Sequence, residues 1–185
     1  MNEVRIVQSV SSSKGSRRLR AAIVGGSMGG LSTALLLREL GHDADVFERA
    51  TGELTGFGAG IVAHEVSTRY FMRLSSSWLS ENTVQVPVHR FLDSSGKKLW
   101  DYPVAYRFVS WGSLYRALLG AFGRERYYQG AALVGFSQDG GGVNLRFANG
   151  QESRYDLLVL ADGLLSTGRQ RLFPGAEPEI GRAHV

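Results

Sequence analysis

Residues 21–31 read AAIVGGSMGGL, which is an apolar run, a glycine-rich turn and the start of a helix. The apolar run over about 19–24 is rich in branched side chains and predicts a buried strand. Apolar residues at helical spacing predict a helix over about 28–40. A second strand is expected over 43–47, and it ends on Glu48. Together these elements predict a βαβ unit with the crossover length of a dinucleotide-binding fold.

The glycines of this turn suggest a nucleotide site. Gly25 allows a sharp turn, and Gly30 lets the helix lie close to the sheet. The N–H groups at the helix start, with the positive end of the helix dipole, would hold a pyrophosphate. Glu48 stands 23 residues after Gly25, where an acid accepts both hydroxyls of an adenosine ribose. Ser27 replaces the second glycine of the usual pattern, but a serine still lets a phosphate approach and donates its own hydroxyl. Structural glycine turns are common, yet the strand before, the helix after and the acid together favour nucleotide binding.

Composition narrows the possible functions. The chain has 185 residues, of which 43% are hydrophobic, enough for one domain with a real core. Its net charge of +4 comes entirely from residues 1–20, and the rest is neutral, so no nucleic-acid partner is expected. We expect residues 1–19 to be a disordered basic tail. The alternative is a targeting presequence, because this tail is rich in serine and arginine and poor in acids.

Metal and membrane chemistry are not expected from this sequence. It contains no cysteine, which excludes disulfides and thiolate metal sites. Its four histidines lack ligand spacing, so no metal site is predicted. No run has the length of a signal-peptide core or a membrane span, which predicts a cytoplasmic protein without a membrane partner.

Smaller elements are expected after the βαβ unit. The glycine-rich stretch 51–60 predicts a loop, either a plain connection or a segment that approaches the flat ring of a cofactor. A helix is expected over 65–79. Residues 84–92 and 97–102 predict a hairpin, and Pro87 indicates that its strand lies at a sheet edge.

The second half of the chain predicts one more helix and several strands. Ser110 is expected to cap a helix that runs to about Phe122. Residues 132–160 predict a three-stranded meander followed by a buried apolar strand over 156–160. Within the meander, the Asn-Gly pair at 149–150 is a two-residue hairpin signal whose central positions both need positive φ.

The buried strand ends in a second group of polar residues. Asp162-Gly163 follows it, and Ser166 and Arg169 come next. A carboxylate at the carboxyl end of a buried strand lies where open α/β sheets bind ligands. The alternative is an ordinary Asp-Gly turn. The functional interpretation is favoured because this strand would pair beside the first βαβ unit.

The order of these motifs resembles the amino-terminal half of the single-component FAD-dependent aromatic hydroxylases, the p-hydroxybenzoate hydroxylase-like flavoprotein monooxygenases. The resemblance covers about residues 20–176. It rests on the following motifs: the glycine turn at 25–30, Glu48-Arg49, Gly58-Ala59-Gly60-Ile61, the meander, and Asp162-Gly163-x-x-Ser166-x-x-Arg169.

Within that family the chain is most similar to the pyridine-hydroxylase branch, which includes 2,6-dihydroxypyridine 3-monooxygenase. The features are GGS at 25–27, TGFGAGIV at 55–62, and RFVSW at 107–111 leading into Leu114-Tyr115. Many family members carry an arginine at the position of Trp111, where it helps to hold the flavin. This chain has an aromatic residue there, as does the pyridine-hydroxylase branch.

The resemblance implies a Rossmann-like α/β FAD-binding domain of the glutathione reductase type over 20–178. It would include the β-meander and, over 80–105, part of a β-rich substrate domain. FAD would be the cofactor, NAD(P)H the co-substrate, and a small aromatic or N-heteroaromatic ring the substrate, with a homodimer for the full-length protein. The implied cofactor-binding residues are Gly25, Gly26, Ser27, Met28, Gly30, Glu48, Arg49, Gly58, Gly60, Trp111, Val134 and Asp162.

Each implied contact has its own role. Ser27 and its backbone would contact the pyrophosphate, Glu48 the adenosine ribose, and Arg49 and the Val134 backbone the adenine end. Asp162 would touch FAD and help NAD(P)H to reduce it. No catalytic residue is assigned.

Three other side chains are candidates for the site lining. They are Tyr115, Trp111 and His64. Core packing is favoured for the two aromatic residues, and a solvated surface position is favoured for His64.

The sequence also departs from the family. The family also has a second motif, Gly-Asp followed by a proline-containing helix, and a sheet that covers the substrate. After Pro178 this sequence contains neither the second motif nor most of that sheet. We therefore expect an incomplete catalytic unit with exposed apolar edges on the meander and on strand 156–160. Residues 179–185 do not continue the family pattern and are expected to be a non-native tail.

Three hypotheses remain open from the sequence. The first is the amino-terminal part of an FAD monooxygenase, inactive alone, and the second is an FAD- or dinucleotide-binding module without catalysis. The third is a related flavin reductase or halogenase. A halogenase should carry a Trp-x-Trp-x-Ile-type motif, which this sequence lacks.

Overall fold

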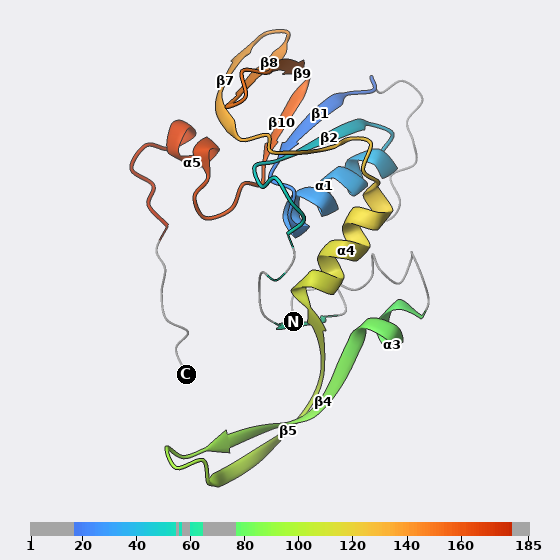
Figure 1. Cartoon of the computed structure of the whole chain (residues 1–185), viewed down its shortest axis with the longest axis vertical. Coiled ribbons are helices and arrows are strands. Elements are labelled where there is room, and N and C mark those ends of the chain that lie inside the picture. The colour runs from blue at the N-terminus through green and yellow to red at the C-terminus, as the bar shows by residue number, and fades with distance from the viewer. Residues whose placement is uncertain (1–16, 55, 57–59, 65–76, 179–185) are drawn as a thin grey trace, which may run out of the picture. The chain divides into compact units, whose positions relative to one another are not determined.

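A computed structural model describes residues 17–54, 56, 60–64 and 77–178 (Figure 1). The chain divides into two compact units, which are described separately. The first unit combines the residues up to Arg49 with those from Arg126 onward, and the second comprises Ala50–Glu125.

A four-stranded parallel sheet forms the centre of the first unit. Its strands lie in the order β10-β1-β2-β6. The bounds are Arg20–Val24 for β1, Asp43–Glu48 for β2, Tyr127–Gln129 for β6 and Leu157–Leu160 for β10. The expected crossover helix is α1, Met28–Glu39. The predicted βαβ unit and the pairing of strand 156–160 beside it are confirmed, whereas the three-residue strand β6 was not predicted.

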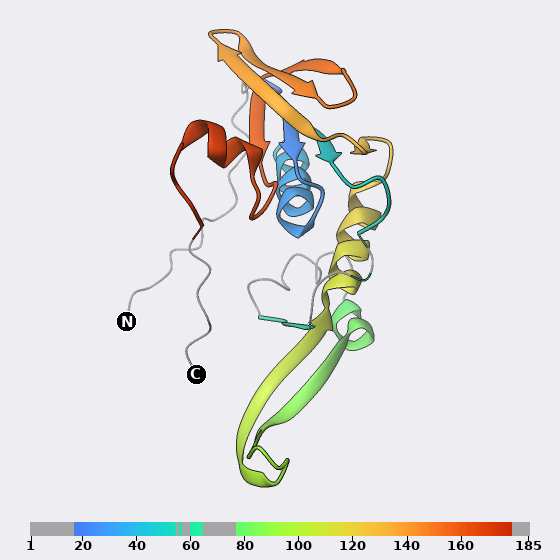
Figure 2. The same cartoon turned by 60° about the vertical axis from the view of Figure 1, so that its left-hand side comes forward.

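A three-stranded meander packs on one face of this sheet. Its strands are β7 (Leu133–Asp139), β8 (Gly142–Phe147) and β9 (Glu152–Tyr155). Figure 2 shows it crossing over the parallel strands. The core between the layers contains Phe47, whose ring lies 4.6 Å from that of Phe147 and 5.9 Å from that of Tyr155. The predicted Rossmann-like α/β fold with a meander is confirmed.

The Asn-Gly turn differs from its prediction. Gly150 has a φ of 82°, but Asn149 has no positive φ. Gly150 N–H donates to the Phe147 carbonyl at 3.0 Å, and Phe147 N–H donates to the Gln151 carbonyl at 2.9 Å. This is a three-residue hairpin loop, a type I turn followed by a left-handed glycine, so one glycine is sufficient.

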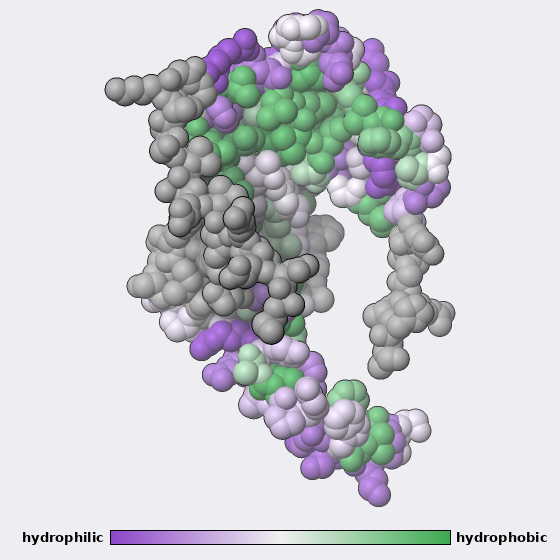
Figure 3. Space-filling model, turned by 180° about the vertical axis from the view of Figure 1, so that it is seen from behind, coloured by the Kyte–Doolittle hydropathy of each residue, from purple (hydrophilic) through white to green (hydrophobic). Residues whose placement is uncertain are grey.

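Strand β10 is half-buried rather than buried, because it lies at the edge of the sheet. A groove of about 600 Å³ in the first unit has Leu157, Leu158 and Leu160 among its lining residues, with Phe136 and Leu172. Figure 3 shows a broad hydrophobic area on one face of the first unit. The expected apolar edge is therefore present in the described part of the chain.

Charged residues pair at the amino ends of the parallel strands. Asp45, 3% exposed, accepts hydrogen bonds from Arg126 Nε at 2.5 Å and from the Tyr155 hydroxyl at 2.8 Å. Arg17 and Arg18, which the sequence analysis placed in the basic tail, form ion pairs with Asp156 and Asp43. These contacts join β1, β2 and β9 to the start of β6.

The described residues of the second unit form a small antiparallel sheet and two helices. The sheet order is β3-β5-β4, with β3 at Gly60–Val62, β4 at Thr83–Leu92 and β5 at Lys98–Ser110. Helix α3 is Trp78–Asn82, and α4 is Trp111–Phe122. The predicted hairpin is confirmed and its return strand is longer than expected. Most of the helix expected over 65–79 lies outside the described residues.

Two local predictions in this unit are confirmed. Pro87 lies on β4, an edge strand, at a register shift between Val86 and Val88. The Ser110 hydroxyl accepts a hydrogen bond from Ser113 N–H at 3.0 Å and caps α4. No helix in the described part of the chain is long and apolar enough to cross a membrane.

The Tyr155 hydroxyl should make stability depend on alkaline pH. Burial, and then its hydrogen bond to the Asp45 carboxylate, raise the Tyr155 pKa above its ordinary value of 10. A raised pKa favours the protonated phenol in the folded state, so its stabilisation is complete below pH 10 and is lost as the pH rises above it. Urea unfolding should therefore show falling stability above pH 10, and Tyr155→Phe should reduce that fall.

At neutral pH the same substitution removes a hydrogen bond to a buried carboxylate, which costs about 1–2 kcal/mol. Tyr102→Phe is the control, because Tyr102 is 54% exposed. An unchanged alkaline slope in Tyr155→Phe would show that another group causes the pH dependence.

Candidate functional site

The glycine turn lies where the carboxyl ends of three parallel strands meet. Gly25 follows β1, and its N–H donates to the Phe47 carbonyl of β2 at 2.8 Å. On the other side, Ala161 N–H, just after β10, donates to the Val24 carbonyl at 2.7 Å. In parallel α/β sheets this edge is where ligands bind.

Close packing requires glycine at three positions of the turn. Gly25 has a φ of 105°, and a Cβ there would lie 2.2 Å from the Ala161 carbonyl oxygen. A Cβ on Gly26 would lie 2.3 Å from the Tyr127 hydroxyl oxygen. A Cβ on Gly30 would lie 1.8 Å from the Gly25 carbonyl oxygen. The roles that the sequence analysis gave to Gly25 and Gly30 agree with these distances.

The start of α1 suits an anion. Ser27 is the N-cap with extended backbone (φ −81°, ψ −169°), and its side chain makes no capping hydrogen bond. The helical hydrogen bond from Leu31 N–H to the Ser27 carbonyl is 2.9 Å long, so the N–H groups before it have no partner within the helix. The first turn of α1 carries no acidic residue. The residues of this turn therefore place no negative charge at the positive end of the helix dipole.

Glu48 lies beside this helix start. Its side chain is buried, with the residue 7% exposed, and its Oε2 accepts a hydrogen bond from Gly26 N–H at 2.7 Å. The acid at the end of β2 therefore contacts the turn directly. Sequence spacing predicted the position of Glu48, but it gave no indication of its bond to Gly26.

Tyr127 is the residue that the sequence analysis missed. It lies on β6, is 7% exposed, and its hydroxyl donates to the Gly26 carbonyl at 3.0 Å. Only the pairing of β6 with β2 brings it there. The sequence signal was weak, because β6 has three residues.

Asp162 organises its own loop. Its carboxylate accepts hydrogen bonds from the Ser166 hydroxyl at 2.6 Å and from Thr167 N–H at 2.8 Å. The Ser166 hydroxyl accepts from Arg169 N–H at 2.9 Å, which caps α5, Thr167–Leu172. Gly163 has a φ of 75°. The Asp-Gly-x-x-Ser-x-x-Arg motif is thus one hydrogen-bonded turn and helix cap directly after β10.

The other predicted residues in the first unit are dispersed. Arg49 is exposed just past β2, and Met28 is half-buried at the first position of α1. Val134 is 41% exposed on β7. Among the described residues, the turn at 25–30, Glu48 and the loop after β10 are what the structure brings together at the strand ends.

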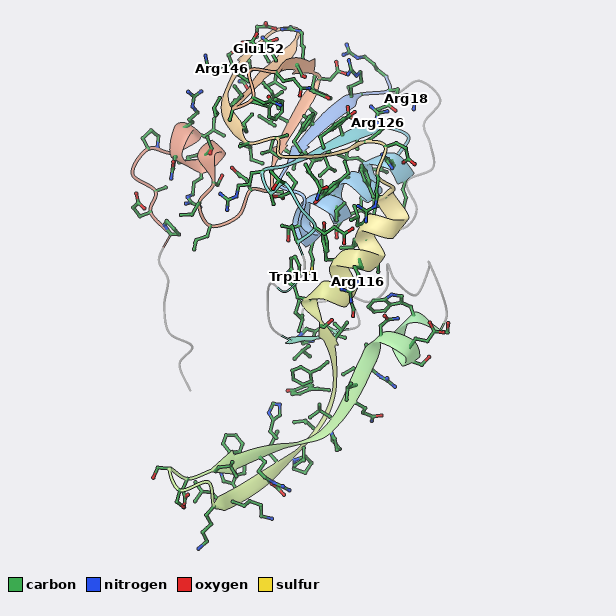
Figure 4. The ribbon with its side chains drawn as sticks, in the orientation of Figure 1. Arg18, Trp111, Arg116, Arg126, Arg146 and Glu152 are labelled. Carbon is green, nitrogen blue, oxygen red and sulfur yellow. The ribbon has the colours of Figure 1, made fainter. Side chains whose placement is uncertain are left out.

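The second unit holds the remaining predicted residues. Gly60 is exposed at the start of β3, and Gly58 lies outside the described residues. Trp111, labelled at the start of α4 in Figure 4, is half-buried and stacks on Tyr115 with ring centroids 5.4 Å apart. Tyr115 is fully buried and His64 is exposed, as expected for core packing and a surface position.

Two neighbouring glycines of α1 give a matched test of the turn. Gly30→Ala should destabilise the fold by roughly 2 kcal/mol or more, because its Cβ would overlap the Gly25 carbonyl. Gly29→Ala has nothing within 4 Å of its Cβ and should be neutral or stabilise by about 0.5–1 kcal/mol through helix propensity. Urea unfolding of both variants measures the difference, and equal stabilities would contradict the close approach.

Comparison with known proteins finds hydroxylases and monooxygenases among the relatives of this chain. Residues 23–102 match the family described as NAD(P)-binding Rossmann-like domain. The chain is 38% identical, over 162 residues, to 2,6-dihydroxypyridine 3-monooxygenase of Paenarthrobacter nicotinovorans. That alignment covers 86% of this chain and 40% of the relative. The alignment with the FAD-dependent urate hydroxylase of Klebsiella pneumoniae likewise covers 40% of that relative, so the chain spans about two-fifths of the length of these two relatives.

Solved structures agree with the sequence match. The structure of 2,6-dihydroxypyridine-3-hydroxylase from Arthrobacter nicotinovorans superposes with a TM-score of 0.82 at 38% identity, covering 89% of this chain and 42% of that chain. Klebsiella pneumoniae HpxO complexed with FAD and uric acid superposes with a TM-score of 0.69 at 25% identity, covering 83% and 41%. The resemblance to FAD-dependent hydroxylases that the motifs predicted is confirmed.

Proposed function

We propose that this chain is the FAD-binding part of a flavin-dependent monooxygenase that uses NAD(P)H and O2 to hydroxylate an aromatic or N-heteroaromatic ring. The observation that supports it most is the tight turn at the strand ends. There the start of α1, whose own first turn carries no acid, adjoins the buried carboxylate of Glu48 on the neighbouring strand. The resemblance to hydroxylases that carry FAD adds the identity of the cofactor.

The residues of the turn fit a dinucleotide. Backbone N–H groups at the start of α1, which have no partner within the helix, would bind a pyrophosphate. Glu48 supplies carboxylate oxygens for the adenosine ribose hydroxyls. Arg49, with an exposed side chain, and the Val134 backbone would contact the adenine end. When bound, FAD supplies the hydride and oxygen chemistry of the reaction.

The remaining predicted contacts keep the roles that the family resemblance gives them. The loop held by Asp162 would lie against the cofactor and help NAD(P)H to reach it. For Gly60 and Trp111, that role is a contact with the flavin. We assign no catalytic residue. The protein's own work is to bind and orient the cofactor and to keep water away from it.

The names of the relatives are the evidence for the substrate class. One relative acts on 2,6-dihydroxypyridine and another on urate, and both are small nitrogen-containing rings. We extend this class to the protein of which the chain forms part, together with a cytoplasmic location and a homodimeric state. A dinucleotide-binding module without catalysis is the second candidate, because the chain spans two-fifths of its enzymatic relatives.

FAD titration of the purified chain tests the proposal. Wild type should quench FAD fluorescence with saturation, and Glu48→Gln should weaken FAD binding about tenfold by removing a charge-assisted hydrogen bond to the ribose. Glu152→Gln is the control, since Glu152 is exposed on β9. A wild type that does not bind FAD would exclude the proposed function.

Consumption of NAD(P)H separates the two candidates. Flavin-dependent oxidation of NADH or NADPH by the FAD-loaded chain would support the enzyme. Flavin that is bound but not reduced would favour the binding module.

A further inference from the structure

We propose that Tyr127 is a positioning residue for the dinucleotide turn, which it holds through the carbonyl of Gly26. The proposal rests on the proposed function, because it concerns the same cofactor site. Its hydroxyl fixes the peptide unit between Gly26 and Ser27, and thereby directs the Ser27 N–H at the pyrophosphate.

Two successive peptide units of the turn are held from neighbouring strands. The Gly26 N–H belongs to the first unit and donates to Glu48 Oε2 of β2 at 2.7 Å. The Gly26 carbonyl belongs to the second unit and accepts from the Tyr127 hydroxyl of β6 at 3.0 Å. The hydrogen bonds to Glu48 and Tyr127 are both buried. The orientation of both units is therefore set by side chains on two strands.

The geometry of a peptide carries this orientation to Ser27. No cis peptide occurs among the described residues, and in a planar trans unit the C=O and the following N–H point in opposite directions. Because the Gly26 carbonyl points at Tyr127, the Ser27 N–H points away from β6. Ser27 is the N-cap of α1, so this N–H has no partner within the helix.

The surrounding contacts leave Tyr127 little freedom. Tyr127 pairs with Val46 in the sheet, and Val46 N–H donates to the Arg126 carbonyl at 2.9 Å. A Cβ on Gly26 would lie 2.3 Å from the Tyr127 hydroxyl oxygen and 2.8 Å from the Glu48 Cβ. The tyrosine hydroxyl can therefore lie against Gly26 only because Gly26 has no side chain. The role of Tyr127 depends on glycine at position 26.

Tyr127→Phe in the full 185-residue chain tests the role. The variant should bind FAD and ADP about tenfold more weakly than wild type, because the buried carbonyl loses its donor and the peptide is free to rotate. Adenosine, which has no phosphate, should bind within twofold of wild type. A general structural defect would weaken ADP and adenosine equally, and that result would overturn the proposal.

Tyr128→Phe is the matched control. Tyr128 is the next residue on β6, is 42% exposed, and loses the same hydroxyl. It should bind ADP and adenosine like wild type. A loss of ADP affinity as large as that in Tyr127→Phe would overturn the specific role of Tyr127.

Amide NMR of the wild type keeps the proposal testable if Tyr127→Phe does not fold. Adding ADP should shift the Ser27 amide resonance strongly, and adenosine should not. If ADP binds but the Ser27 amide resonance does not shift, the inference is overturned and the proposed function still stands. Failure of wild type to bind either FAD or ADP would instead overturn the proposed function, and this inference with it.

Discussion

The structure depends on close backbone contacts at the glycine turn, where Gly25 lies against Ala161 and Gly30 lies against Gly25. A Cβ at Gly25 or Gly30 would lie within about 2 Å of a carbonyl oxygen, closer than any contact allows. These close contacts allow α1 to begin at the carboxyl ends of β1, β2 and β10. It also brings Gly26 within hydrogen-bonding distance of Glu48. The absence of side chains at these glycines therefore makes room for protein atoms: the Ala161 carbonyl, the Tyr127 hydroxyl and the Gly25 carbonyl.

Acidic side chains lie at both ends of the parallel sheet. At the amino ends, acids and arginines are paired: Asp43 with Arg18 at 2.6 Å, and buried Asp45 with Arg126. These pairs satisfy the buried charge, which would otherwise be costly. At the carboxyl ends, the start of α1 carries no acid in its first turn. There the Glu48 carboxylate accepts a hydrogen bond from the Gly26 N–H, beside the positive end of the helix dipole.

Strand β10 has the composition of an interior strand but an edge position. Its sequence Leu-Leu-Val-Leu is apolar on both faces, as in parallel strands that are covered on both sides. In the sheet it has β1 on one side, and its residues are half-buried. The relatives are more than twice as long as this chain. An open apolar edge of this kind favours association with another strand.

The sequence by itself determined the elements whose signals are local. The glycine turn, the lengths around it and the Ser110 cap follow from neighbouring residues, and they predicted β1, α1, β2 and α4. The Rossmann-like class followed because the acid at Glu48 has a fixed distance from the turn.

Tertiary structure decided what depends on strands meeting. Tyr127 reaches Gly26 only because β6 pairs with β2, and three residues give too little pattern to reveal such a strand. The burial of Asp45 under Tyr155 joins residues 110 positions apart. Strand β10 is half-buried because it lies at the edge of the sheet. The apolar sequence of its four residues does not indicate this position. Local chemistry specifies elements, whereas the contacts that orient the site arise only from long-range packing.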